Sequence, residues 1–356
     1  MRELPVPDLY SSEHARSWVY QPDLPSLFAE AQHWRRELGV RTAANDRQRV
    51  HLLLVDLQRD FCFPEGALFV AGREGDGAMR DSDRLVRFLY RNLESVSDIT
   101  YTLDSHVPHQ IFFASFWVDR QGRALEPGRV ISSEQVRSGE AQPNPEMAWW
   151  LCDGNTEWLR REVLHYCQEL ERQGKYELFL WPLHCLMGGD GHALVGVVQE
   201  ARLFHSWVRG SDAFVELKGM NPLTENYSVF SPEVLSRHDG KALAERNQRF
   251  LDTMLSVDAL VIAGQASSHC VKSSLEDLLA EIETRGRALA ERIYVLTDCM
   301  SAVTVPDPNL PGTLSFDFTD QAEATFERCR RAGMHLVRST EPMKEWPGLA
   351  AGSDPS

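Results

Sequence analysis

The sequence lacks long apolar runs, paired cysteines and concentrated positive charge. No apolar run approaches the roughly 18 residues that span a membrane, and the N-terminal residues lack the apolar core of a secretion signal. The seven cysteines are odd in number and form no Cys-x-x-Cys pair, so neither a disulfide framework nor a thiolate zinc cluster is indicated. A net charge of −15 without basic runs argues against nucleic acid as a partner. We therefore expect a cytoplasmic protein with no membrane and no nucleic-acid partner.

The composition is that of a globular protein, because 43% of the 356 residues are hydrophobic and 25% are charged. Short β-rich segments alternate with segments of helical period. This order predicts an α/β fold: a three-layer, doubly wound sheet of about six mostly parallel strands, with helices on both faces. The expected strands are 51–56, 98–103, 177–181, 213–217, 258–263 and 292–297.

Three parts of the chain fall outside this alternation. Residues 1–48 carry several aromatics and are expected to form a helical arm on the domain or on a neighbouring subunit. The main domain then covers 49–341, with an insertion at 113–175 that includes a helix near 155–173. Long insertions act as lids, binding loops or oligomer contacts, so a homo-oligomer is one expectation. The C-terminal tail, 342–356, is expected to be solvated coil.

Polar residues follow several predicted strands, at the sheet edge where open parallel sheets bind ligands. They are Asp56, Asp104 with His106, His184 and Lys218. Cys270 follows the next strand, in the first turn of an expected helix. The positive end of a helix lowers the pKa of a cysteine, which favours a nucleophile there. Taken alone, however, Cys270 fits better as a small buried thiol packed between strand and helix, and the polar residues at the other strand ends reverse that preference.

Five segments carry a resemblance to a known family. They are Asp56-Leu-Gln-Arg-Asp-Phe-Cys-Phe-Pro-Glu-Gly-Ala-Leu, Thr102-Leu-Asp104-Ser-His106, Trp181-Pro-Leu-His184-Cys, Lys218-Gly and Gly264-Gln-Ala-Ser-Ser-His-Cys270-Val. Together they resemble the nicotinamidase branch of the isochorismatase-like cysteine hydrolases, over a stretch that runs from His51 to Val303.

The resemblance implies a catalytic set of Asp56, Lys218 and Cys270. It also implies an oxyanion hole made by the backbone amides of Ala266 and Cys270, with a cis peptide between Gln265 and Ala266. Elementary chemistry supports these roles, because Asp56 beside a thiol can accept its proton and Lys218 between them stabilises the thiolate. His269, next to the nucleophile, is an alternative base. We prefer Asp56, because adjacent residues at a helix start point in different directions.

The resemblance further implies a divalent metal ion held by Asp104, His106 and His184. One carboxylate and two imidazoles suit zinc first, with iron and manganese as alternatives. The family usually has another histidine several residues beyond its Asp-x-His, whereas His109 follows His106 by only three positions. His109 could coordinate directly, bind through water, or only orient the loop.

Three aromatics are candidates for the substrate pocket. In the family arrangement Phe61 and Trp181 would sandwich a flat heteroaromatic ring, and Tyr227 would close one side; the alternative is that all three are ordinary core aromatics. Gly188-Gly-Asp-Gly191 lacks the ending of a phosphate loop and is interpreted as a turn. His192, His205 and His238 are expected at the surface or at helix caps.

Three functions remain open on these grounds. The first is a metal-containing cysteine amidohydrolase that acts on nicotinamide or a close pyridine carboxamide. The second is a hydrolase of the same fold acting on another small amide or an isochorismate-like vinyl ether, although isochorismatase relatives generally lack the metal residues. The third is a non-catalytic scaffold, which would be free to lose Asp56, Lys218 or Cys270. The presence of all three makes a scaffold the weakest hypothesis.

Overall fold

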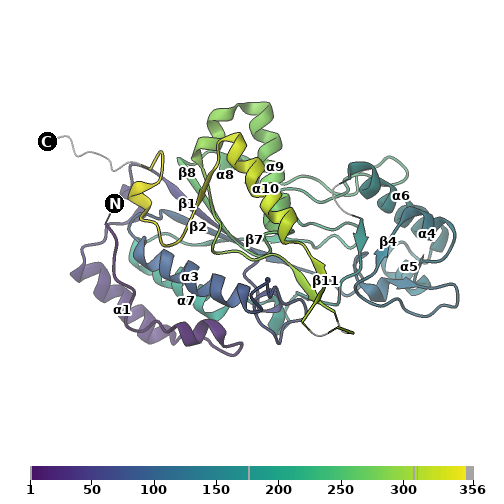
Figure 1. Cartoon of the computed structure of the whole chain (residues 1–356), viewed down its shortest axis with the longest axis horizontal. Coiled ribbons are helices and arrows are strands. Elements are labelled where there is room, and N and C mark those ends of the chain that lie inside the picture. The colour runs from purple at the N-terminus through teal and green to yellow at the C-terminus, as the bar shows by residue number, and fades with distance from the viewer. Residues whose placement is uncertain (1, 175–176, 308, 311, 350–356) are drawn as a thin grey trace.

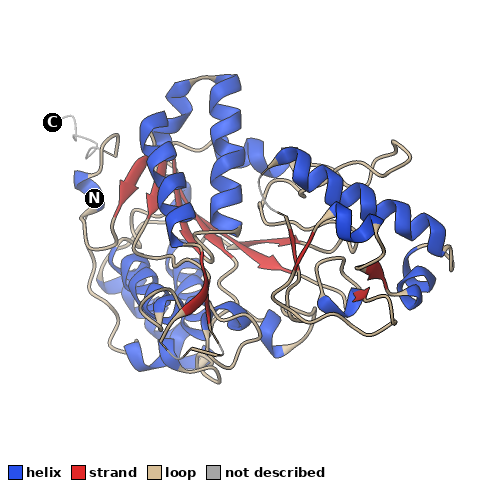
Figure 2. Ribbon diagram, turned by 45° about the vertical axis from the view of Figure 1, so that its right-hand side comes forward, coloured by secondary structure: helices blue, strands red, loops and turns tan. Residues whose placement is uncertain are grey.

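A six-stranded parallel sheet lies at the centre of the molecule (Figures 1 and 2). The structure is a computed structural model that describes residues 2–174, 177–307, 309–310 and 312–349. All neighbouring strands of the sheet run parallel. In spatial order the strands are β12 (His335–Val337), β9 (Ile293–Leu296), β8 (Ala259–Gly264), β1 (Val50–Val55), β2 (Asp98–Asp104) and β7 (Phe214–Lys218).

Helices cover both faces of the sheet, which confirms the predicted three layers, while the edge strand β7 stays largely exposed. Strand β1 shows the alternation that a strand requires: Leu52 and Leu54 pack into one apolar cluster, and Leu53 and Val55 into the other. The first cluster is completed by α3 (Gly77–Arg91), α7 (Gly196–Arg209) and α1 (Leu24–Glu37). The second is completed by α8 (Gln248–Leu255), α9 (Cys270–Arg285) and α10 (Thr319–Ala332).

One predicted strand is wrong, and the sheet takes a different sixth strand. Within 177–181 only β6 (Leu178–Phe179) is extended, and it pairs antiparallel with β4 (Val130–Ile131) outside the main sheet. The run is apolar because it packs in the insertion, and the Trp181 amide donates to the Phe112 carbonyl at 2.8 Å. The sheet instead ends in β12, which pairs with β9.

The N-terminal segment lies on its own domain. Helix α1 packs against α7, where the Trp34 ring meets Phe204 edge-on at 5.1 Å. Trp18 meets Phe63 in the same way at 5.9 Å. Before and after α1 the arm forms short 3₁₀ turns, η1 (Ser12–Arg16) and η2 (Ala43–Asn45).

The prediction of a solvated tail from Pro342 is wrong for residues 342–349. Met343, Trp346 and Leu349 are all buried there, around the 3₁₀ turn η6 (Met343–Glu345). The Trp346 ring stacks on Phe88 at 5.6 Å, so this segment belongs to the core. Residues 350–356 of the predicted tail lie outside the described residues.

The insertion forms a lobe beside the sheet with an apolar cluster of its own (Figure 1). Its longest helix, α6 (Thr156–Gln173), confirms the helix expected near 155–173. The Asn155 side chain caps that helix at its start, and Gly174 ends it in the left-handed conformation. The other elements of the lobe are η3 (Ala114–Phe116), β3 (Trp117–Val118), β4, α4 (Ser133–Arg137), β5 (Gln142–Pro143), α5 (Pro145–Leu151) and β6.

Short elements complete the chain. They are α2 (Arg59–Cys62), η4 (Asp190–His192), η5 (Arg287–Arg292) and the antiparallel pair β10 (Thr304–Pro306) and β11 (Leu314–Asp317). Among the described residues, no helix is both long enough and apolar enough to cross a lipid bilayer.

His205 was expected at the surface but is fully buried on α7, where its Nε2 lies 2.9 Å from the Val96 carbonyl oxygen. Burial lowers the pKa of this imidazole from its usual value of 6.5 to about 4. The unfolded chain therefore binds the proton first as pH falls, so stability that is complete above pH 6.5 is lost towards pH 4.

We expect this titration to be visible in the pH dependence of unfolding. Between about pH 6.5 and 4, His205 should account for a loss of about 3 kcal/mol in the free energy of unfolding. Denaturant unfolding of His205→Gln should show a correspondingly shallower fall than the parent. His33→Gln, on the exposed side of α1, should keep the parental slope. Identical slopes for all three proteins would remove His205 from this account.

Candidate active site

The strand register brings the predicted polar residues to one edge of the sheet. Val55 of β1 pairs with Gly264 of β8, so Asp56 and the loop that leads to Cys270 leave the sheet side by side. On the other side of β1, Asp104 of β2 pairs directly with Lys218 of β7. Residues that are far apart in sequence therefore meet where the strands end.

The Lys218 ammonium is the centre of a buried charged cluster. Its Nζ lies 2.9 Å from Asp56 Oδ2 and 3.0 Å from Asp104 Oδ1. It also lies 3.6 Å from the Cys270 sulfur and donates to the Asn226 carbonyl at 2.9 Å. The side chains of Lys218, Asp56, Asp104 and Cys270 are each less than a tenth exposed. One cation thus joins two carboxylates and a thiol away from solvent.

Asp56 is held in place by Thr102, for which the sequence predicted no role. The Thr102 hydroxyl donates to Asp56 Oδ1 at 2.5 Å and accepts from the Asp56 amide at 3.0 Å. The backbone of Asp56 has a φ of 46°, in the left-handed region that few non-glycine residues adopt. Such conformations gather at functional sites, where the surrounding structure enforces them.

The predicted depression of the Cys270 pKa is wrong for this arrangement. Burial raises the pKa of the thiol well above its usual range; Lys218 opposes this rise, and the carboxylates of Asp56 and Asp104 add to it. Cys270 does begin helix α9 as expected. The helix terminus is outweighed because the thiol is nine-tenths buried beside two negative groups. The resting thiol is therefore protonated and needs a base.

Asp56 has the electrostatic properties of that base. Burial raises its pKa, while Lys218 and the Thr102 hydrogen bond lower it. A carboxyl group with a raised pKa takes up a proton more readily than an exposed one. Burial disfavours the charge on Lys218, but Asp104 and Asp56 outweigh it and raise the ammonium pKa well above its usual range. Lys218 therefore stays charged while a proton moves between sulfur and carboxylate.

The loop before Cys270 contains the expected cis peptide between Gln265 and Ala266. Within the described residues, neither the Ala266 amide nor the Cys270 amide donates a hydrogen bond to another group. Both lie at the wall of the same cavity as the Cys270 thiol. Two unused backbone donors beside a nucleophile are what an oxyanion hole requires.

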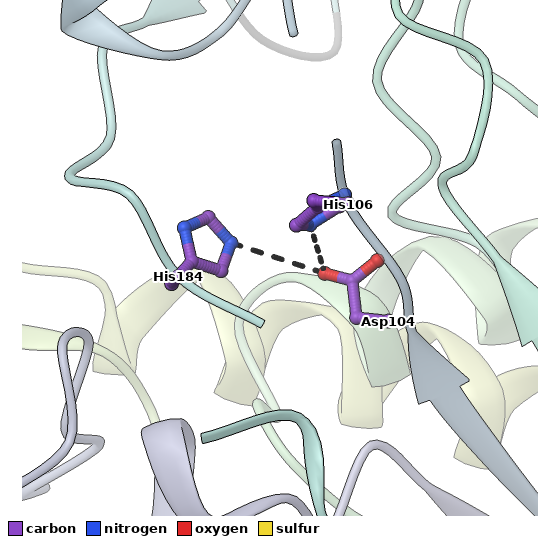
Figure 3. A group of neighbouring side chains, drawn as sticks. All are labelled: Asp104, His106 and His184. Atoms are coloured by element: carbon purple, nitrogen blue, oxygen red, sulfur yellow. Dashed lines mark ion pairs between the residues drawn. The ribbon is translucent and has the colours of Figure 1, made fainter. Parts of the chain in front are cut away.

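Asp104, His106 and His184 form a compact group of metal-binding type (Figure 3). The Nε2 atoms of His106 and His184 lie 3.0 and 4.0 Å from the same oxygen, Asp104 Oδ2, and the two rings face it from different sides. All three side chains are buried. A carboxylate and two imidazoles that converge from separate segments form a donor set suited to a divalent cation.

Hydrogen bonds orient the two imidazoles for this purpose. His184 Nδ1 lies 2.8 Å from the Pro182 carbonyl oxygen, and His106 Nδ1 lies 3.2 Å from the Gly219 carbonyl oxygen. Each Nδ1–H can donate there, which leaves the Nε2 lone pair for a metal. Gly219 is needed for the close approach: an added Cβ would lie 2.7 Å from Asp104 Oδ1. The residues present therefore fit a divalent cation.

A narrow cavity opens beside the cluster and is lined by aromatic rings. Phe61 and Trp181 lie in its wall together with Tyr227, and Cys270 and His184 lie at its polar side. The Trp181 indole N–H donates to the Tyr227 hydroxyl at 2.9 Å, which fixes two of the rings relative to each other. The cavity thus places an apolar, aromatic-lined space beside both the thiol and the metal-binding group.

The comparison with known proteins supports this picture. The chain is 25% identical to the nicotinamidase of Escherichia coli (strain K12) over 260 residues, which cover 71% of this chain and 84% of that enzyme. This chain is similar in sequence to that enzyme over most of its length. No family model matches it.

Solved nicotinamidase structures align with most of the chain at low identity. The yeast nicotinamidase bound to the inhibitor nicotinaldehyde is 18% identical, with a TM-score of 0.49, over 81% of this chain and 99% of that one. The pyrazinamidase of Pyrococcus horikoshii in complex with zinc is 17% identical, with a TM-score of 0.43, over 82% and 99%. The relationship to the nicotinamidases therefore rests on the sequence match and the motifs.

His109 lies apart from the group formed by Asp104, His106 and His184. Its ring stacks on Trp150 of the insertion at 5.4 Å, and it lines a different surface cavity. The group of converging ligand atoms contains Asp104, His106 and His184 without it. In this arrangement His109 is therefore not placed to coordinate the same metal ion directly.

His269 is placed as a wall residue of the aromatic cavity. Its Nδ1 lies 2.9 Å from the Ser268 hydroxyl, and its ring meets Trp181, Tyr227 and Phe318 edge-on. Burial, together with Lys272, lowers the pKa of this imidazole to about 3. A base must bind a proton at working pH, so His269 is a poorer candidate than Asp56.

Glu225 is a second site residue that the sequence did not reveal. It is buried in the wall of the aromatic cavity, and burial together with Asp104 raises its pKa to about 8. It lies in an irregular loop after Lys218, where no strand or motif marks it. Near neutral pH it can carry a proton and donate a hydrogen bond into the cavity.

The glycine-rich segment forms a turn, as predicted, and this turn packs against Asp60. A Cβ on Gly191 would lie 2.1 Å from Asp60 Oδ2, so this turn presses directly onto Asp60. The same Asp60 oxygen accepts from the Cys185 amide at 2.6 Å. The turn and Asp60 thereby fix the segment that carries His184.

Proposed function

We propose that this chain is a metal-containing cysteine amidohydrolase that converts nicotinamide, or a close pyridine carboxamide, into the acid and ammonia. The observation that carries the proposal is the single lysine ammonium that joins Asp56, Asp104 and Cys270 beside an aromatic cavity. The nicotinamidase of E. coli as a sequence relative supports the substrate class.

The first half of the reaction forms a thioester. The Cys270 sulfur attacks the amide carbon as its proton passes to Asp56, and Lys218 stabilises the developing thiolate. The Ala266 and Cys270 amides hold the negative oxygen of the tetrahedral intermediate. The carbon–nitrogen bond then breaks, and Asp56 returns the proton to the departing ammonia.

The second half releases the acid. Water attacks the thioester carbonyl while Asp56 accepts a proton from that water. The carbon–sulfur bond breaks, and the proton returns to the Cys270 sulfur, so the resting state is restored.

Asp104, His106 and His184 would hold the metal ion, with zinc first and iron or manganese as alternatives for this donor set. When bound, such a cation supplies a Lewis acid that can engage water or a pyridine nitrogen. Phe61 and Trp181, with Tyr227 at one side, would hold the flat ring of the substrate.

Two amides that differ in one ring atom test this proposal. Benzamide has the ring and the carboxamide of nicotinamide but no ring nitrogen. A site that engages a specific heteroatom rejects the analogue without it, so kcat/KM for benzamide should be lower by about 10³-fold or more. The measurement is ammonia release from both amides. Equal turnover of the two would place the substrate outside the nicotinamide class.

Metal content gives an independent test of the ligand assignment. His184→Ala and Asp104→Ala should each lose bound metal in elemental analysis, whereas His33→Ala on the exposed side of α1 should keep it. Retention of metal by both site variants would show that the ion is held elsewhere. Full activity of a metal-free preparation would show that the metal-binding group has no part in turnover.

A further inference from the structure

A second, larger cavity adjoins the aromatic cavity of the candidate site. Its volume is about 510 Å³, within the range of small-molecule pockets. Tyr227 and His269 line both cavities, and their rings meet edge-on at 5.4 Å. These two side chains therefore form the boundary between an inner space at Cys270 and an outer space, which we call the outer cavity.

The outer cavity lies between the insertion lobe and the C-terminal part of the main domain. The insertion lobe contributes Phe179 of β6 and Leu170 of α6; the other side contributes Phe316 of β11 and Phe318. Phe179 and Phe316 meet edge-on at 5.5 Å across the two parts. Phe316 and Phe318 stack with nearly parallel rings, 6.1 Å apart. The walls are thus built from partly exposed aromatic rings.

Among the described residues that line the outer cavity, the charged side chains have one sign. Glu171 and Glu177 contribute carboxylates, and Gln321 contributes an amide. Among the described lining residues there is no lysine or arginine, and burial together with Lys272 lowers the pKa of His269 to about 3, so its imidazole is neutral. Glu171 is fixed by the Ser133 amide and hydroxyl at 2.6 and 2.7 Å. Such a surface favours neutral or cationic groups and repels anions.

We propose that the physiological substrate is a heteroaromatic primary carboxamide with an extended aromatic substituent that is neutral or positively charged. The carboxamide ring occupies the inner cavity, and the substituent passes the Tyr227–His269 boundary to lie among Phe179, Phe316 and Phe318. Amides that carry a phosphate are disfavoured, because the lining residues that the structure describes include two carboxylates and no cationic side chain. This inference rests on the proposed amidohydrolase function and specifies its substrate.

The test compares nicotinamide with nicotinamides that carry a phenyl, a 4-(aminomethyl)phenyl or a 4-carboxyphenyl group at ring position 5 or 6. For at least one position, kcat/KM of the phenyl and aminomethylphenyl amides should exceed that of nicotinamide by about tenfold, the scale of one aromatic contact with its buried area. The carboxyphenyl amide should be the poorest of the substituted set. Substituted amides that are all worse than nicotinamide would overturn the proposal.

Variants locate the effect in the outer cavity. Phe316→Ala should lower kcat/KM for the phenyl amide by about tenfold and leave nicotinamide within about twofold. Glu177→Gln should weaken only the aminomethylphenyl amide. The controls are Phe28→Ala and Glu37→Gln on α1, which lie outside the cavity and should change neither substrate. Equal losses for nicotinamide and the phenyl amide in Phe316→Ala would also overturn the proposal.

The results differ if the proposed function itself is wrong. If no amide is hydrolysed, amidohydrolase activity is wrong, and the outer cavity is judged by calorimetric binding of the same compounds to the parent and to Phe316→Ala. Binding of the phenyl amide that is tighter than that of nicotinamide and lost in Phe316→Ala supports the outer cavity as a ligand site. Absence of such a difference refutes it.

Discussion

Cys270→Ala is expected to abolish ammonia release, with a loss of at least about 10³-fold, because Cys270 is the one thiol among the described residues that line the cavity. The fold should survive. The side chain is small and already packed between β8 and α9, so its loss should cost only about 1 kcal/mol of unfolding free energy. The measurements are steady-state ammonia release and denaturant unfolding of the same preparation.

A matched cysteine separates chemistry from packing. Cys329 is fully buried in the same apolar cluster, so Cys329→Ala removes a thiol of the same size far from the charged cluster. It should keep parental turnover. Near-normal activity of Cys270→Ala, or an equal loss in both variants, would end the cysteine-hydrolase interpretation.

Lys218→Met should have the second-largest effect, on both activity and stability. The substitution leaves Asp56 and Asp104 buried without their shared cation, and breaking a buried ion pair costs about 3–5 kcal/mol. Turnover should fall at least about 10²-fold, the scale of a positioned acid–base group. Alkylation of Cys270 by iodoacetamide at a fixed pH should also slow, because the ammonium stabilises the thiolate.

The control is a lysine buried to a similar degree. Lys272 on α9 pairs with Glu276 at 3.3 Å, so Lys272→Met also removes a buried ammonium. It should leave the alkylation rate of Cys270 within about twofold of the parent. An unchanged alkylation rate in Lys218→Met would remove that lysine from the activation of the thiol.

The sequence predicted the sheet well where strands are buried on both faces. All six residues of β1 and of β8 are buried, and apart from His51 in β1 they appear in the sequence as apolar runs. Strand β12 was not predicted, because it has only three residues, two of them partly exposed, at the edge of the sheet. The apolar run 177–181 was wrongly predicted to be a strand of this sheet. Apolar residues that pack in a separate lobe give the same short apolar run as a buried strand.

The candidate site was predictable where polar residues end strands and follow a motif. Asp104 and Lys218 could be expected together because parallel strands end at one edge, and their register confirms it. Thr102 gave no signal, because threonine is an ordinary strand residue and its bond to Asp56 crosses between strands.

The direction of the Cys270 pKa shift could not be predicted from the sequence for a related reason. Its direction depends on burial and on two carboxylates that come from different strands. A helix start is visible in the sequence, whereas the density of negative charge around the thiol appears only in three dimensions.

The central claim is tested most directly by incubating the metal-loaded protein with nicotinamide and measuring ammonia and nicotinate together. The account predicts equal amounts of the two products, and an acid-quenched sample should carry a nicotinoyl thioester on Cys270 by peptide mass spectrometry. Absence of ammonia from metal-loaded, folded protein would contradict it, as would turnover with the acyl group found on any residue other than Cys270.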